Sequence, residues 1–170
     1  YGKILRSPHA HAIIKSIDTS KAEALPGVKA VITSADFPEI PQGTGWGDMS
    51  RNTIAREKAL FDGHPVAAVA ATSEQLAKRA CKLVEVEYEV LPHVIDVEDA
   101  MAEGAPILHD YMRTKGDENA PDVPTNICEK MVSKLGDVAV GFEAADCVVE
   151  HEFDSKPMHQ GYIEPQGCIA

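Results

Sequence analysis

Hydrophobic and polar residues alternate with a period of two in several short runs of the chain. Within residues 85–90 the alternation is strict, with Val86, Tyr88 and Val90 on one side and three glutamates on the other. This pattern is typical of a strand with one buried face, so we expect the glutamates to face water rather than a metal. The unbroken apolar run 65–71 predicts a strand covered on both faces. Further strands are predicted over residues 2–6, 11–18, 28–33, 147–153 and 161–170.

A helical period follows the run 65–71. Between residues 72 and 84 the apolar side chains fall on one face and the lysines and the arginine on the other. Thr72 and Gln75 have the spacing of a capping box, which predicts that Thr72 caps this helix. Cys81 lies on the apolar face and is therefore expected in the core. Shorter helices are predicted over residues 19–25, 94–103 and 137–145, the last capped by Asp137.

Two stretches show no period. Residues 38–52 contain two prolines and three glycines, which predicts a long exposed loop. Trp46 in this loop either contacts a partner or substrate or is a buried plug that holds its own loop in place. The plug is favoured, because aromatic side chains usually contribute buried area. Residues 110–126 are polar and contain proline and glycine, which predicts a linker or mobile loop.

Charge and cysteine usage exclude several classes of protein. The chain has 170 residues with 16 Lys+Arg, 27 Asp+Glu and a net charge of −11, which excludes a nucleic-acid-binding surface. No apolar stretch approaches the roughly 18 residues that cross a bilayer. We therefore expect no membrane span and a cytoplasmic location, with export of the parent protein left open. The four cysteines stand singly, which predicts reduced, mostly buried thiols rather than zinc or iron–sulfur ligands.

Only two pairs of residues suggest chemistry. His9 and His11 are two positions apart, so a strand would place both on one face, where a third ligand could complete a metal site. No third ligand follows from the spacing, and a structural role is favoured. His159 and Glu164 could meet a ligand at a domain junction, although His159 could equally cap a backbone group. The residues alone indicate an acidic α+β domain without a complete site.

Five groups of residues follow one another in an order that matches a known pattern. They are Gly2-x-Ile4-x-Arg6-Ser7-Pro8 with His11-Ala12, Leu25-Pro26-Gly27-Val28-x-Ala30-Val31-Ile32-Thr33, Asp62-Gly63-x-Pro65-Val66-Ala67, Val86-x-Tyr88-Glu89-x-Leu91-Pro92, and Leu108-His109. This order resembles the α/β hammerhead domain of the xanthine dehydrogenase and aldehyde oxidase family of molybdenum hydroxylases. Gly136-Asp137-Val138, Val148-Val149-Glu150 and Ile163-Glu164-Pro165 resemble the start of the molybdopterin-binding domain that follows the hammerhead.

The resemblance implies an α+β fold in three parts. Residues 1–109 would form an α/β hammerhead with a mixed sheet, residues 110–135 a linker or mobile loop, and residues 136–170 the first strands of the molybdopterin-binding domain. It also implies a large subunit with a molybdopterin (cytosine dinucleotide) molybdenum cofactor, partnered by a [2Fe–2S] subunit and an FAD subunit in a homo- or hetero-oligomer. The substrate would be a small molecule: an aldehyde, an N-heterocycle, CO or an aromatic CoA thioester.

The residues that carry catalysis in the family lie beyond Ala170. We therefore assign no catalytic, cofactor-binding or metal-binding residue within the chain, and keep His159 and Glu164 as candidates for positions near the domain junction. The last predicted strand runs to Ala170 without a stop signal, so we expect the parent protein to continue. Two alternatives stay open: a free-standing hammerhead scaffold without catalysis, and a small metal-binding protein that uses His9 and His11.

Overall fold

A computed structural model describes residues 1–163 of the chain. The chain divides into two units, Tyr1–Met131 and Val132–Ala170. The first unit holds both sheets and all but one of the helices in the described residues. The two units are therefore considered separately.

One sheet of the first unit has the order β1-β5-β3, with β1 at Gly2–Arg6, β5 at Pro65–Ala71 and β3 at Val28–Thr33. The central strand β5 pairs antiparallel with both neighbours, and Ala68 stands opposite Ile4 on one side and Ile32 on the other. Val66, Ala67 and Val69 of this strand are buried, as the apolar run predicts.

The other sheet has the order β4-β2-β6, with β4 at Lys58–Ala59, β2 at Ala12–Asp18 and β6 at Glu85–Val90. The α+β class is confirmed, but the predicted mixed sheet is wrong. Each strand in residues 1–163 pairs only with neighbouring strands that run in the opposite direction, so both sheets are antiparallel. The three glutamates of β6 face solvent as predicted, whereas Val90 is also exposed at the strand end.

The core lies where α3 (Glu74–Cys81) packs on β5 and β1, close to α1 (Ser20–Glu23). Small side chains allow this close approach, and the cluster includes Ala67, Ala80 and the predicted core thiol Cys81. Ser73, not Thr72, caps α3, because the Ser73 hydroxyl accepts a hydrogen bond from the backbone N–H of Leu76 at 3.2 Å. The predicted cap is therefore displaced by one residue, and Leu76 rather than Gln75 lies three positions after it, so Thr72 and Gln75 form no capping box.

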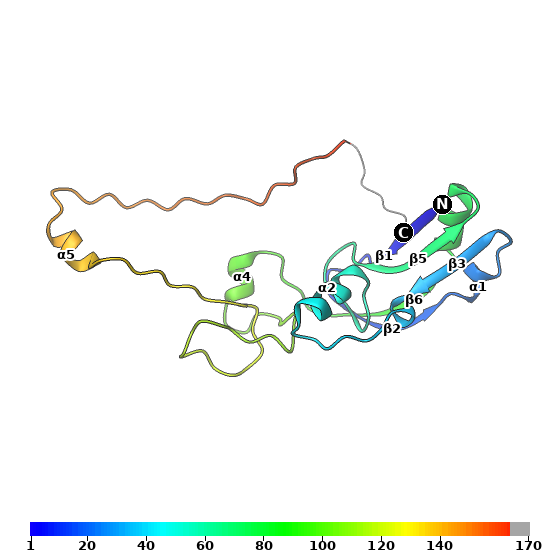
Figure 1. Cartoon of the computed structure of the whole chain (residues 1–170), viewed down its shortest axis with the longest axis horizontal. Coiled ribbons are helices and arrows are strands. Elements are labelled where there is room, and N and C mark those ends of the chain that lie inside the picture. The colour runs from blue at the N-terminus through cyan, green and yellow to red at the C-terminus, as the bar shows by residue number, and fades with distance from the viewer. Residues whose placement is uncertain (164–170) are drawn as a thin grey trace. The chain divides into compact units, whose positions relative to one another are not determined.

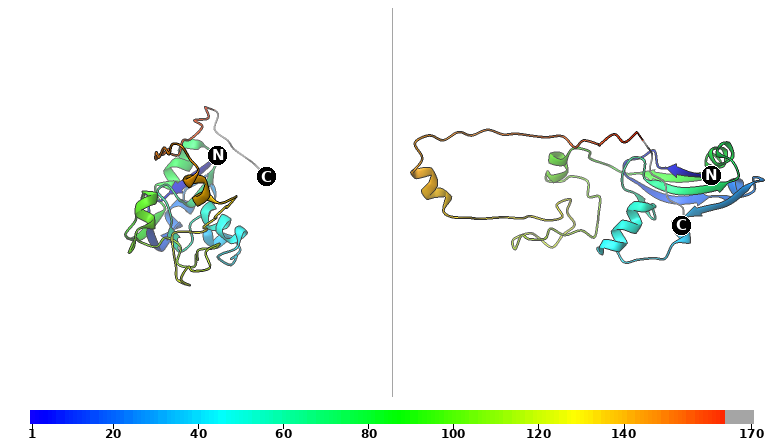
Figure 2. Two further views of the ribbon diagram at one scale, coloured as in Figure 1. Left: turned by 90° about the vertical axis from the view of Figure 1, so that its left-hand side faces the viewer. Right: turned by 45° about the horizontal axis from the view of Figure 1, so that its top comes forward.

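The stretch 38–52 contains a helix that the sequence did not predict. After the short 3-10 turn η1 (Ser34–Asp36), helix α2 runs over Gly45–Thr53. Its cap is Thr44, whose hydroxyl accepts from the backbone N–H of Gly47 at 3.0 Å. The views in Figures 1 and 2 place α2 and α3 toward opposite ends of the strands. Trp46 is 73% exposed, so its predicted role as a buried plug is wrong: α2 is held by Arg51 instead.

The remainder of the first unit, residues 93–131, has little regular structure. Helix α4 covers only Val97–Met101 of the predicted 94–103, because Asp96 caps it by accepting from the N–H groups of Glu98 and Asp99. Residues 110–126 contain no helix or strand, as predicted. None of the helices in residues 1–163 is both long and apolar enough to cross a bilayer.

The described part of the second unit has one helix, α5 (Val138–Glu143), capped by Asp137 as predicted. The strand predicted over 147–153 is absent, because no strand within residues 1–163 forms backbone hydrogen bonds with this segment. Residues 161–163 are not in a strand, and the remainder of the predicted strand 161–170 lies outside the described residues. Of the three cysteines within residues 1–163, Cys81 is buried, whereas Cys128 and Cys147 are exposed, which corrects the expectation of mostly buried thiols; Cys168 lies outside the described residues.

Candidate functional site

Two adjoining pockets in the first unit form the candidate site. The polar pocket, of about 160 Å³, is lined by Gln42, Arg51, Arg56, Glu57, Lys58, Asp110 and Tyr111. The apolar pocket, of about 320 Å³, is lined by Ala10, His11, Phe61, Asp62, His93, Val94, Ile95, Ala100, Pro106, Met112 and Asn126. Leu60, Leu108 and His109 line both. The pockets are therefore neighbours that share one wall.

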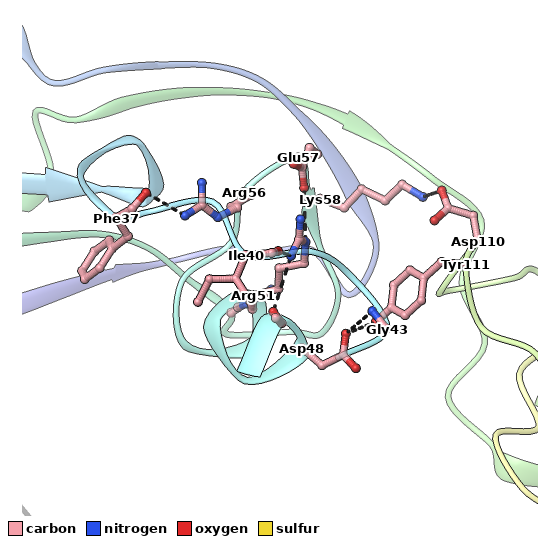
Figure 3. Close-up of polar contacts among 12 residues, drawn as sticks. Phe37, Ile40, Gly43, Asp48, Arg51, Arg56, Glu57, Lys58, Asp110 and Tyr111 are labelled. Carbon is pink, nitrogen blue, oxygen red and sulfur yellow. Dashed lines mark hydrogen bonds and ion pairs between the residues drawn. The ribbon is translucent and has the colours of Figure 1, made fainter. Parts of the chain in front are cut away.

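Arg51 forms the floor of the polar pocket and is only 8% exposed. It extends from the last turn of α2, and its Nη1 donates to the carbonyl of Ile40 at 2.7 Å and, more weakly, to that of Gly47 at 3.5 Å (Figure 3). Its Nε lies 3.9 Å from Glu57 Oε2, which is an ion pair without a hydrogen bond. The buried guanidinium therefore anchors the loop before α2 to the helix itself.

Arg56, in the segment that follows α2, also binds backbone carbonyls of the segment that precedes the helix. Its Nη2 donates to the carbonyls of Phe37 and Pro38 at 2.9 and 2.7 Å (Figure 3). The Nε atoms of both arginines are buried and have no hydrogen-bond partner among residues 1–163. Backbone carbonyls thus engage one terminal guanidinium nitrogen of each arginine, Nη1 of Arg51 and Nη2 of Arg56.

Two contacts bind the segment around residue 110 to the polar pocket. Lys58 of β4 pairs with Asp110 at 2.9 Å, and this hydrogen bond holds the pKa of Asp110 below its usual value. The Tyr111 hydroxyl donates to Asp48 Oδ1 at 2.7 Å (Figure 3). Burial, followed by the neighbouring Asp48 carboxylate, raises the pKa of Tyr111 to about 12. Tyr111 is therefore an un-ionised donor at neutral pH.

His64 stands behind the wall that the pockets share and is fully buried. Its Nδ1 accepts from the backbone N–H of Leu60 at 3.0 Å, and its Nε2 contacts the carbonyl of Arg51 at 2.7 Å. A carbonyl only accepts, so Nε2 carries the proton and the ring is the neutral Nε2–H tautomer. Burial lowers the pKa of His64 and favours this neutral form. The ring also stacks on Phe61, with centroids 4.2 Å apart.

His11 lines the apolar pocket and is 5% exposed. Its Nδ1 lies 2.9 Å from the carbonyl of Pro92, so Nδ1 is the protonated nitrogen. Its Nε2 is buried and has no hydrogen-bond partner among the described residues. His109 lies in the shared wall, and burial lowers its pKa, so this ring is neutral at pH 7.

The structure does not bring His9 and His11 together at one site. His9 packs edge-on against Tyr88, with ring centroids 5.0 Å apart, whereas His11 turns into the apolar pocket. Residues 1–163 contain no group of three His, Cys, Asp or Glu side chains placed to hold a metal ion. His159 Nδ1 accepts from the N–H of Gly161 at 2.9 Å, which is a backbone contact, and Glu164 lies outside the described residues.

No pattern in the sequence marks Arg51, Arg56, His64 or His109 as site residues. Arg51 was hidden because its helix was predicted as a loop. His64 and His109 are single histidines without a partner at a characteristic spacing, so only the burial in the folded structure distinguishes them. Gly63 and Pro65, which flank His64, were the available signal for a tight, buried turn.

Comparisons with known proteins connect this structure to a group of oxidoreductases. Residues 1–92 match the family profile described as "Aldehyde oxidase and xanthine dehydrogenase, a/b hammerhead domain". The probable hypoxanthine oxidase of Escherichia coli O157:H7 is 36% identical across 98% of this chain and 20% of its own length. The carbon monoxide dehydrogenase large chain of Afipia carboxidovorans is 38% identical across 100% of this chain and 22% of its own.

A solved structure agrees with these similarities. The crystal structure of a Cu,Mo-CO dehydrogenase in its carbon monoxide reduced state matches 64% of this chain with a TM-score of 0.54 and 43% identity, and 14% of that chain is covered. The chain thus spans about a fifth of the length of the curated relatives named above. The fold and the sequence therefore point to the same group of proteins.

Proposed function

Because the chain belongs to the aldehyde oxidase and xanthine dehydrogenase family, we propose that it is part of the large subunit of a molybdenum-containing oxidoreductase. The observation that carries this proposal is the extent of the similarity. The relatives match 98–100% of the chain, well past the hammerhead residues 1–92. A scaffold that had retained only the hammerhead fold gives no reason for similarity to continue through the second unit.

The proposed division of the chain follows from the same likeness. Residues 1–109 form the hammerhead domain, residues 110–135 connect, and residues 136–170 begin the molybdopterin-binding domain. The exposed apolar side chains of the second unit support this division, since Val138, Phe142 and Val149 are each more than half exposed. Apolar surface of this kind is typical of a segment that packs against further protein.

The proposed cofactor is molybdopterin, in its cytosine dinucleotide form, with molybdenum. The described residues do not fit this group. In the polar pocket one terminal guanidinium nitrogen of Arg51 and one of Arg56 already donate to carbonyls, and the carboxylates of Glu57 and Asp110 would repel its phosphates. We place the cofactor on other parts of the large subunit and assign no catalytic step to these residues.

The role of this chain is then structural. The hammerhead packs against the molybdenum-carrying domains, helps to wall the substrate channel and contacts a [2Fe–2S] subunit and an FAD subunit, to which electrons from the substrate pass. The substrate is a small molecule of the class formed by aldehydes, N-heterocycles, CO and aromatic CoA thioesters. The names of the relatives, a hypoxanthine oxidase and a carbon monoxide dehydrogenase, lie within that range.

Purification of the native polypeptide from its source, with an antibody raised against this chain, tests the proposal. We expect a complex that contains an iron–sulfur subunit, identified by mass spectrometry and visible absorption, and that reduces a dye with one of the four substrate classes. The recombinant 170-residue chain is the matched control and should give no turnover. A native polypeptide that purifies without any partner and without dye reduction would refute the proposal and favour a scaffold.

A further inference from the structure

The apolar pocket has the dimensions and lining of a small-molecule site. Its volume of about 320 Å³ lies at the lower end of the range, roughly 300–1,000 Å³, in which proteins bind such ligands. Its walls come from separate parts of the first unit: the segments before β2, after β4 and after β6, then α4 and residues 106–112. The apolar contacts are supplied by Leu60, Phe61, Val94, Ile95, Leu108 and Met112.

One wall of this pocket is held rigid by Asn126. Its side-chain amide donates to the carbonyls of Ala100 and Pro106, both at 3.0 Å, while its oxygen accepts from the N–H of Leu108 at 3.1 Å. All of these contacts are internal, so Asn126 shapes the pocket without offering a free group to a ligand. The pocket is therefore preformed, which reduces the ordering cost of binding.

His11 has the one buried polar atom of the described lining that still needs a partner. In the neutral imidazole whose Nδ1 donates to Pro92, Nε2 carries a lone pair and acts as an acceptor. A buried acceptor without a donor costs free energy, and a donor delivered by a ligand recovers that cost. The site thus selects a molecule that carries an N–H or O–H group.

The charge of the ligand follows from the remaining polar lining. His109 is neutral at pH 7, and His93 and Asp62 are exposed at the rim rather than enclosed. A charged ligand would lose its hydration without gaining a buried counter-ion, which is unfavourable. We propose that the apolar pocket binds a small, uncharged, mainly apolar molecule that donates one hydrogen bond to Nε2 of His11. This inference rests on the first unit alone and does not depend on the proposed redox function.

Indole and benzofuran test this assignment in the full 170-residue chain. Both are flat and apolar and nearly equal in size, but only indole carries an N–H donor. We expect indole to shift the His11 imidazole resonances in NMR spectra and to bind about tenfold more tightly than benzofuran, the effect of about one hydrogen bond. Equal binding of the two probes, or no shift of the His11 resonances by millimolar indole, would overturn the proposal.

Two variants locate the effect at His11. His11→Phe removes the acceptor and keeps an aromatic ring, and it should bind indole and benzofuran equally. His9→Phe is the matched control two residues away and outside the pocket, and it should retain the tenfold preference. If His11→Phe does not fold, the comparison of the two probes in the unaltered chain still decides the question. Retention of the preference in folded His11→Phe would contradict the assignment.

Discussion

Replacement of His64 by alanine is predicted to destabilise the first unit severely. The imidazole is fully buried, and its two ring nitrogens satisfy the N–H of Leu60 and the carbonyl of Arg51. Each backbone group left without a partner in a buried site costs about 1–3 kcal/mol. The lost stacking on Phe61 adds to this cost. We therefore expect His64→Ala to lower the free energy of unfolding by about 3–5 kcal/mol, a large part of a typical domain stability of about 5–15 kcal/mol.

Urea denaturation followed by far-UV circular dichroism measures this loss. With a denaturant dependence of about 2 kcal/mol per molar urea, the midpoint should fall by about 2 M. His93→Ala is the matched control, because His93 is exposed and its removal should change the free energy by less than about 0.5 kcal/mol. Equal midpoints for the two variants would refute the structural role of His64.

The same variant should change how stability depends on pH. Burial lowers the pKa of His64 in the folded state from its ordinary value of 6.5, and it also lowers the pKa of His109. Above pH 6.5 neither state binds the proton, so the full stability is present. As the pH falls below 6.5, the unfolded chain binds protons that the folded chain does not. Each such histidine then lowers the stability by up to about 1.4 kcal/mol per pH unit, until the pH passes the lowered pKa.

Below pH 6.5 the free energy of unfolding of His64→Ala should therefore fall less steeply than that of the unaltered chain. The slope due to His109 remains in both proteins. Identical slopes between pH 6.5 and 5.5 would show that His64 is not held neutral by the fold, whatever the size of the stability loss.

Two further changes test local features of the first unit. Tyr111→Phe removes a hydrogen bond to the Asp48 carboxylate and should lower the free energy of unfolding by about 1.5–3 kcal/mol. Ultraviolet titration of the unaltered chain should find one tyrosine that ionises near pH 12. If all four tyrosines ionise near pH 10, the contact between Tyr111 and Asp48 is contradicted. In urea denaturation, Ser73→Ala should lower the free energy of unfolding by about 1 kcal/mol, because it removes the cap of α3. Thr72→Ala should lower it by less than about 0.5 kcal/mol. A larger loss for Thr72→Ala than for Ser73→Ala would show that Thr72 is the cap.

Much of the first unit was predictable because its elements follow simple periods. Alternation in residues 85–90 placed the glutamates in solvent, and the helical stripe placed Cys81 in the core. Helix α2 was missed because glycines oppose helix formation. Gly47 is nevertheless required there, since a Cβ at this position would lie 2.0 Å from the carbonyl oxygen of Pro41. Helix α2 therefore depends on the close approach of Gly47 to the backbone of Pro41, which no local sequence pattern encodes.

The second unit and the site show the other limits of sequence reasoning. Residues 147–153 have the composition of a strand, but a strand forms only with a neighbour, and none is present among residues 1–163. The functions of Arg51 and His64 depend on backbone carbonyls that the fold brings beside them. A single arginine or histidine carries no spacing signal for such contacts, so both could be found only in the folded structure.

The molybdenum content of the native polypeptide that contains this chain tests the central claim most directly. Elemental mass spectrometry of the protein purified from its source should find molybdenum in an equimolar ratio to this polypeptide, together with iron carried by a co-purifying subunit. Molybdenum far below that ratio in a folded native protein, from cells that supply molybdenum to their other enzymes, would contradict membership in a working molybdenum-containing large subunit.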